Sequence, residues 1–125
     1  MSLEGTLEVS AGVSTTEAEG EREPDSRSVE FAFAVENQGE KAVELSFTDA
    51  AKAEFVVYED GQEHWRYTDG RLFAQLLSRD RIEPGGTTTY RATWERAEPG
   101  TYTAIATLRA QETDCQARSR FSVPG

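Results

Sequence analysis

The chain has 125 residues, the size of one ordinary domain, and this length is enough to bury a hydrophobic core of its own. Its 23 acidic and 13 basic side chains give a formal net charge of −10, which repels nucleic-acid phosphates and anionic membrane surfaces. The single cysteine excludes an internal disulfide, and no apolar run is long enough to span a bilayer. We therefore expect one domain over residues 1–125 in a reducing cytoplasm, with neither nucleic acid nor a membrane as its partner.

The acidic excess comes mainly from glutamate, and the basic residues are nearly all arginine, with Lys41 and Lys52 as the only lysines. A surface of this kind is typical of proteins that stay soluble in concentrated salt. An acidic protein from a GC-rich genome has a similar composition. Both a halophilic and a non-halophilic origin therefore remain open.

The first predicted strand covers residues 7–13, where apolar residues alternate with polar or small ones. Residues 14–27 lose this alternation and are rich in acidic side chains, which predicts a long surface loop with solvated charges. Strict alternation returns over residues 29–36 and predicts a second strand that ends at the turn Asn37-Gln38-Gly39. Residues 43–47 predict a third strand, which we expect to form an antiparallel hairpin with the second.

Residues 54–58 are apolar enough to form a strand that is buried on both faces. The turn at Asp60-Gly61 should pair this strand with the next one, on which Trp65 and Tyr67 share one face while His64 and Arg66 point to the other. Thr68-Asp69-Gly70 ends that strand. Residues 71–78 then fit either a single helical turn or an irregular segment over the end of the sheets.

The rest of the chain predicts a turn at residues 82–86, strands at 88–94, 102–108 and 117–123, and a polar turn at 111–114. Tyr102 follows the Pro99-Gly100 turn, where immunoglobulin-like folds often place a corner tyrosine. The sequence therefore predicts an all-β fold, an immunoglobulin-like antiparallel β-sandwich of about 7–9 strands. A jelly roll is the second choice.

Residues that carry catalysis or bind metals are sparse. The only histidine, His64, lies in a predicted strand, and the chain contains no Gly-x-Ser-x-Gly nucleophile elbow. One histidine and one cysteine, Cys115, cannot build a usual zinc site, and no glycine-rich loop leads into a helix that could hold phosphate. We expect no enzymatic activity, no metal site and no cofactor.

Rings and guanidinium groups are densest between residues 63 and 75. In one interpretation, Trp65, Tyr67, Arg71 and Phe73, together with Arg66, form a partner-binding patch of the kind enriched at protein interfaces. In the other, the aromatic rings belong to the core of the sandwich and the two arginines form ordinary surface ion pairs. Composition does not decide between these two interpretations.

Several segments, in this order, resemble the BsuPI family of intracellular proteinase inhibitors. They are residues 31–37, 43–47, 54–57, 65–75 (Trp-Arg-Tyr to Phe-Ala-Gln), 82–86, 90–94 and 99–102. The resemblance covers roughly residues 29–108, and the chain departs from the family at residues 51–54, which are small or charged. The resemblance implies an immunoglobulin-like sandwich and a non-enzymatic role inside the cell, with a subtilisin-like intracellular serine proteinase as the expected protein partner.

The resemblance assigns no inhibitory residues, so the inhibitory segment is predicted from physical requirements. A substrate-like inhibitor needs an exposed, extended segment that adds a strand to the enzyme cleft and offers a side chain to its specificity pocket. Residues 72–78 fit this requirement, with Leu76 and Leu77 as apolar anchors, although the same leucines could instead cap the core. The alternative function is a generic immunoglobulin-like interaction or accessory module without inhibitory activity. A projecting, ordered loop favours inhibition, whereas a flat aromatic patch favours a docking module.

Overall fold

The computed structural model describes residues 2–13 and 27–124, which form nine β-strands joined by turns and loops. In chain order the strands are β1 (Leu3–Val13), β2 (Arg27–Asn37), β3 (Val43–Phe47), β4 (Ala53–Glu59), β5 (Gln62–Arg66), β6 (Ser78–Ile82), β7 (Thr87–Glu95), β8 (Gly100–Leu108) and β9 (Gln116–Val123). No helix long and apolar enough to cross a membrane occurs within these residues.

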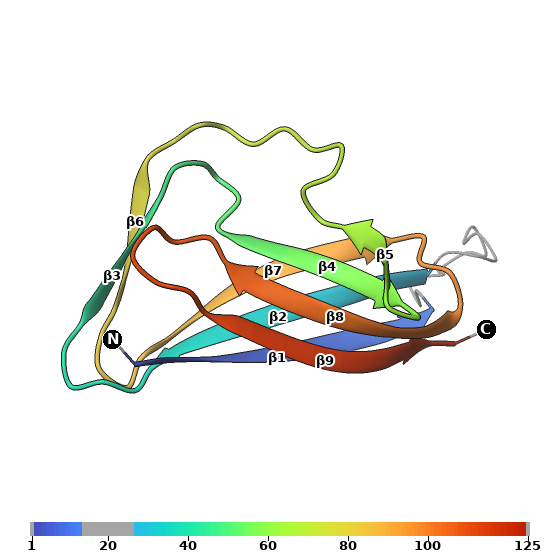
Figure 1. The fold of residues 1–125 in the computed structure, drawn as a ribbon, viewed down its shortest axis with the longest axis horizontal. Coiled ribbons are helices and arrows are strands. Elements are labelled where there is room, and N and C mark those ends of the chain that lie inside the picture. The colour runs from blue at the N-terminus through green and yellow to red at the C-terminus, as the bar shows by residue number, and fades with distance from the viewer. Residues whose placement is uncertain (1, 14–26, 125) are drawn as a thin grey trace, which may run out of the picture.

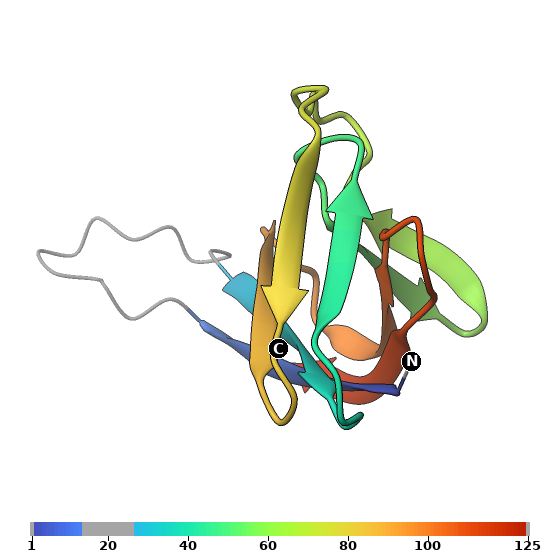
Figure 2. The ribbon, with the colours of Figure 1, turned by 90° about the vertical axis from the view of Figure 1, so that its left-hand side faces the viewer.

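Two antiparallel sheets face each other, and a two-stranded ribbon lies across one end of them (Figures 1 and 2). One sheet has the strand order β1-β2-β7 and the other the order β5-β4-β8-β9, while β3 pairs with β6 in the ribbon. The prediction of an immunoglobulin-like antiparallel β-sandwich is confirmed, and the nine described strands fall within the predicted range.

The core forms where the inward faces of β2 and β4 meet. The alternating apolar residues of β2, from Val29 to Val35, are completely or almost completely buried. Phe31 and Phe33 both contact Phe55 of β4, with ring centroids 5.8 and 6.4 Å apart. Edge-to-face and tilted aromatic pairs of this kind stabilise a core beyond the area they bury. The period-two pattern of the sequence thus places large rings on one side of each strand.

The two sheets approach each other closely at Gly5 of β1. A side chain at this position would place its Cβ 2.8 Å from Cε1 of Phe33 and 3.0 Å from the sulfur of Cys115. Glycine is therefore needed here for close packing between β1 and the start of β9, which lie side by side in Figure 1. Cys115 is a buried free thiol, and its burial raises the pKa of the thiol group.

The predicted corner tyrosine is present. The hydroxyl of Tyr102 donates a hydrogen bond of 2.7 Å to the backbone carbonyl of Glu98, four residues upstream. This contact ties the turn between β7 and β8 to the start of β8, as the corner tyrosine does in immunoglobulin-like domains. Burial, followed by the nearby carboxylates of Glu59 and Glu98, raises the pKa of the Tyr102 hydroxyl.

The prediction that the second and third strands form a hairpin is wrong. β2 pairs with β1 and β7, whereas β3 leaves this sheet and pairs with β6. Asn37 accounts for the difference, because its buried amide donates to the carbonyls of Lys41 (2.8 Å) and Ile82 (2.9 Å). Its side-chain oxygen also accepts from the backbone N–H of Gly39 (2.9 Å). Asn37 thus directs the chain from one sheet to the ribbon instead of closing a hairpin.

Other differences concern the bounds of the elements. The first strand begins at Leu3 and not at Leu7, and β2 already includes Arg27, the last residue of the predicted acidic loop. The rest of that loop, residues 14–26, lies outside the described residues. Strand β6 was not predicted, and its last residue, Ile82, was placed in a turn. The turn itself is present, since the N–H of Gly86 donates 2.8 Å to the carbonyl of Glu83.

Candidate functional site

The connection between β5 and β6, residues 67–77, projects beyond the sheets at the top of Figure 1 and of Figure 2. We refer to it as the β5–β6 loop. Its first residues form successive tight turns, in which the N–H of Asp69 donates to the carbonyl of Arg66 and that of Arg71 to Thr68. The later residues have no regular secondary structure, so the irregular alternative of the sequence prediction is confirmed and the helical turn is wrong.

The base of the β5–β6 loop is a stack of three side chains. The guanidinium of Arg71 lies 4.8 Å from the ring centroid of Tyr67, and its Nε donates 2.7 Å to the carbonyl of the same tyrosine. The ring of Phe73 lies 5.6 Å from that of Tyr67, which in turn meets Phe55 of the core edge-on at 5.8 Å. These cation–π and aromatic contacts order the start of the loop against the core.

Glu54 of β4 fixes the loop from a second side. Its Oε2 accepts from the hydroxyl of Thr68 at 2.5 Å and pairs with the guanidinium of Arg66 at 3.2 Å. Arg66 also pairs with Glu63 at 2.9 Å, and this hydrogen bond lowers the pKa of the Glu63 carboxyl. Sequence reasoning missed Glu54. The local pattern gave no signal for it, because a regular hairpin across Asp60-Gly61 sets Arg66 opposite Phe55, and only the register shift after Val57 brings Arg66 diagonal to Glu54.

A neighbouring loop holds the middle of the β5–β6 loop. The N–H of Ala50 donates 2.9 Å to the carbonyl of Ala74, and this is the one backbone hydrogen bond of residues 72–77 within the described part of the chain. The loop that carries Ala50 is itself fixed, because Arg109 contacts both the carboxylate of Asp49 (3.0 Å) and the carbonyl of Ala51 (2.7 Å). The β5–β6 loop is therefore held at its start and its middle.

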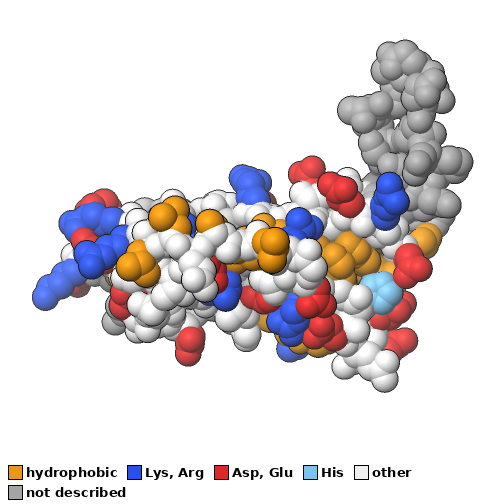
Figure 3. Space-filling view, turned by 90° about the horizontal axis from the view of Figure 1, so that it is seen from above, with side chains coloured by type: hydrophobic (Ala, Val, Ile, Leu, Met, Phe, Trp, Pro, Cys, Tyr) orange, Lys and Arg blue, Asp and Glu red, His pale blue; other side chains and the backbone are white. Residues whose placement is uncertain are grey.

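Three leucines of this loop point into solvent. Leu72, Leu76 and Leu77 are 101%, 62% and 81% exposed, and they are the large apolar side chains that the described residues expose most. The alternative that they cap the core is therefore wrong. Figure 3, which looks onto this side of the molecule, shows hydrophobic side chains among basic and acidic ones. Exposed apolar groups on an ordered loop are typical of contact with another protein.

Trp65 is placed differently from the leucines, because its half-buried ring faces the core. It stacks on Phe31 and on Trp94, with centroid distances of 5.8 Å in both cases. Arg66 and Arg71 make the contacts described above. The six predicted partner-binding residues therefore fall into three groups. Trp65 packs on the core, and Arg66, Arg71 and Phe73 surround the base of the loop. Leu76 and Leu77 are exposed.

His64 does not point away from Trp65 as the alternation predicts. The register between β4 and β5 shifts after Val57, so that His64 is an extra residue in β5 and forms a β-bulge. As a result its ring also packs on Trp94, with a centroid distance of 5.5 Å. Nε2 of His64 lies 3.3 Å from a carboxylate oxygen of Glu98. No group of three or more potential metal ligands occurs among the described residues.

Comparison with known proteins places this arrangement in a family. The sequence profile of BsuPI, described as an intracellular proteinase inhibitor, matches residues 14–113. The chain belongs to the BsuPI family. The match contains the whole β5–β6 loop and all its supporting contacts, and it extends beyond residues 29–108, the range of the sequence resemblance. No curated protein sequence matches the chain.

Solved structures similar to this BsuPI domain share its fold at low sequence identity. A putative β-galactosidase from Bacteroides fragilis has a TM-score of 0.54 and 13% identity over 95% of this chain and 17% of its own. The β-glucuronidase 2 of Bacteroides uniformis has a TM-score of 0.53 and 14% identity over 94% of this chain and 13% of its own. The CARDB domain of PF1109 from Pyrococcus furiosus, in complex with di-metal ions, has a TM-score of 0.50 and 16% identity. The similarity covers 98% of this chain and 93% of the CARDB domain.

The chain thus spans less than a fifth of the length of the two glycosidases, and these likenesses concern the β-sandwich alone.

Proposed function

We propose that this BsuPI chain inhibits a subtilisin-like serine proteinase of the cytoplasm through protein–protein contact, without catalysing a reaction itself. The observation that carries the proposal is the exposure of Leu72, Leu76 and Leu77 on the β5–β6 loop. A subtilisin-like cleft binds an extended segment by main-chain pairing and accepts apolar side chains in its pockets. The family of intracellular proteinase inhibitors to which the chain belongs supports the same function.

The backbone of the loop is suited to main-chain pairing. Residues 72–77 make one backbone hydrogen bond within the described residues, through the carbonyl of Ala74, so their other peptide groups are available to the strands of an enzyme cleft. The stack on Tyr67 and the hydrogen bond from Ala50 restrict the loop before it binds. Such restriction reduces the conformational entropy that the loop loses when it binds the enzyme.

The alternative of a generic docking module has less support from the geometry. It requires a flat, exposed aromatic patch, whereas Trp65 and Tyr67 are half-buried. Trp65 stacks on Phe31 of the core, and Tyr67 meets Phe55 of the core edge-on. The exposed apolar surface lies instead on the leucines of the projecting loop. We therefore assign the partner contact to the loop.

Inhibition assays with a subtilisin-like proteinase, in low and in high salt, test this proposal. Leu77→Arg replaces an exposed apolar anchor by a charge and should raise the inhibition constant by about tenfold or more, since one well-placed apolar contact is worth about 1–3 kcal/mol. Gln38→Arg adds the same charge at the distant β2–β3 turn and should leave the constant unchanged. Mass spectrometry should find residues 67–78 uncut after stoichiometric inhibition.

Two results would contradict the proposal. The first is rapid cleavage of the folded chain within the β5–β6 loop without inhibition, which would make the loop a substrate. The second is an equal inhibition constant for the wild type and a folded Leu77→Arg variant, which would place the contact elsewhere.

A further inference from the structure

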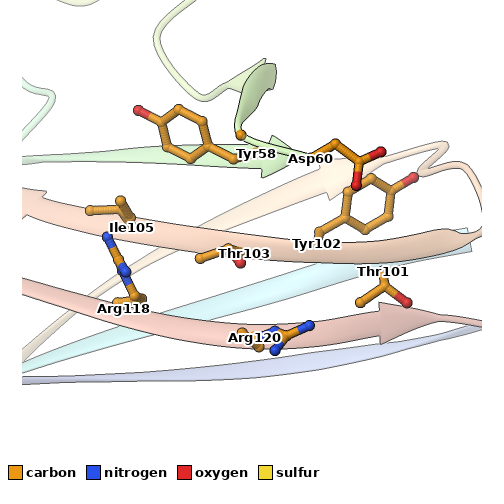
Figure 4. A pocket seen from close by; sticks show the side chains of 9 residues that line it. Tyr58, Asp60, Thr101, Tyr102, Thr103, Ile105, Arg118 and Arg120 are labelled. Carbon is orange, nitrogen blue, oxygen red and sulfur yellow. The ribbon is translucent and has the colours of Figure 1, made fainter.

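The outer face of the four-stranded sheet carries a shallow trough that the proposed inhibition does not use. It runs along β8, where the outward side chains are short, and it has a volume of about 610 Å³. Tyr58 of β4 stands on one side of it, and Arg118 and Arg120 of β9 stand on the other (Figure 4). Thr103 and Ile105 form its floor between them.

The strand register explains this shape. Thr103 pairs with both Tyr58 and Arg120, and Ile105 pairs with Arg118, so each short residue of β8 is flanked by a long one. Residues two apart on a strand point to the same face. The trough is therefore built mainly by three neighbouring strands, and Asp60 and Gly61 of the β4–β5 turn complete one end of it.

The charges of the trough contrast with those of the whole molecule. Arg118 and Arg120 are exposed, and within residues 2–13 and 27–124 neither forms an ion pair. Arg66, Arg81 and Arg109 are paired with carboxylates. Arg91 and Arg96 also lack an ion pair within these residues, but they do not line the trough. In a chain of net charge −10, two neighbouring guanidinium groups that have no ion pair within the described residues are suited to attract an anion.

The spacing of the two arginines indicates the kind of anion. Side chains two residues apart on a strand are separated by about 6.5–7 Å, which is also the separation of alternate residues in an extended peptide. Carboxylates at positions i and i+2 of such a peptide can meet both guanidinium groups at once. The ring of Tyr58 on the opposite side offers apolar contact, and the hydroxyl of Thr103 can hydrogen-bond a passing peptide group.

We propose that this trough binds an extended acidic segment of a partner protein, with carboxylates two residues apart seated on Arg118 and Arg120. Asp60 is the one carboxylate among the residues that line the trough, and it lies near Tyr102 and Thr101 in Figure 4. The acidic segment is therefore placed toward the Arg118 end. The trough is made of β4, β8, β9 and the β4–β5 turn, so the site is separate from the leucines of the β5–β6 loop and does not rest on proteinase inhibition.

Fluorescence anisotropy with a labelled peptide tests the proposal. The probe is a fluorescein-labelled heptapeptide of sequence Gly-Thr-Glu-Val-Glu-Thr-Gly, compared with the same peptide carrying glutamine in place of both glutamates. The full chain should bind the acidic peptide saturably and the amide peptide at least tenfold more weakly, because only the carboxylates form charge-assisted hydrogen bonds with the guanidinium groups.

Paired variants locate the site. Arg118→Gln combined with Arg120→Gln should raise the dissociation constant about tenfold or more. Arg91→Gln combined with Arg96→Gln removes the same charge from exposed positions on and after β7 and should change it less than twofold. Absence of saturable binding would overturn the proposal. An equal loss in both double variants, or equal binding of the amide peptide, would also overturn it, because the contact would then be non-specific.

Discussion

Replacing Asn37 by alanine should destabilise the protein more than any other polar substitution at the β2–β3 turn. The Asn37 side chain is 0% exposed and makes three hydrogen bonds, two donated to the carbonyls of Lys41 and Ile82 and one accepted from the N–H of Gly39. A neutral hydrogen bond contributes about 0.5–1.5 kcal/mol, and a buried group left without a partner costs about 1–3 kcal/mol. Because the Ile82 carbonyl is the partner that becomes most isolated, we expect a total loss of about 3 kcal/mol.

Urea unfolding followed by tryptophan fluorescence measures this loss. Gln38→Ala is the matched control, since its side chain makes one exposed hydrogen bond, to Glu4, and its removal should cost less than about 0.5 kcal/mol. Asn37→Asp keeps the shape of the side chain but cannot donate to either carbonyl, so it should be at least as destabilising as alanine. A loss below about 1 kcal/mol for Asn37→Ala would refute the reasoning, because the three hydrogen bonds would then not be stabilising.

Two further predictions concern titrating groups. Cys115 is buried, and its burial raises the pKa of the thiol. At about pH 8 we therefore expect the native protein to react with Ellman's reagent more slowly than the urea-unfolded chain, and equal rates would contradict this. Burial and the hydrogen bond to Asp80 raise the pKa of Tyr90 above its ordinary value of 10.0. The unfolded state therefore loses this proton first, and the free energy of unfolding should fall as the pH rises above about 10. In Tyr90→Phe this fall should be smaller between about pH 9 and pH 11, and an unchanged pH dependence would count against the assignment.

The sandwich was predictable from the sequence because its long strands have one solvent-exposed face and one buried face. The alternation of Phe31 and Phe33 with Glu30 and Ala32 and the position of Tyr102 after a Pro-Gly turn both follow from local rules, and both predictions are confirmed. β6 is not predictable by this rule, because it lacks an apolar face that alternates with a polar one. Its sequence Ser-Arg-Asp-Arg-Ile buries only the isoleucine, since the strand pairs with β3 alone in a ribbon that has little core to cover.

The parts of the site that were not predictable depend on long-range contacts. The turn signal at Asn37 predicts a hairpin, because it does not show that the Asn37 side chain bonds to Ile82, 45 residues away. The bulge at His64 changes one residue's direction without any mark in the local pattern. Leu76 and Leu77 were identified as anchor candidates, but only the structure shows that they are exposed and do not pack on the core.

The exposure of the three loop leucines has a consequence for how this protein can change over evolution. The core closes without Leu72, Leu76 and Leu77, and the contacts that order the loop come from Tyr67, Glu54 and Ala50. Substitutions at the three leucines should therefore leave the free energy of unfolding within about 0.5 kcal/mol of the original. Under the proposed inhibition, folding and target choice then depend on different residues, so the target range can drift, or be redesigned, on an unchanged framework.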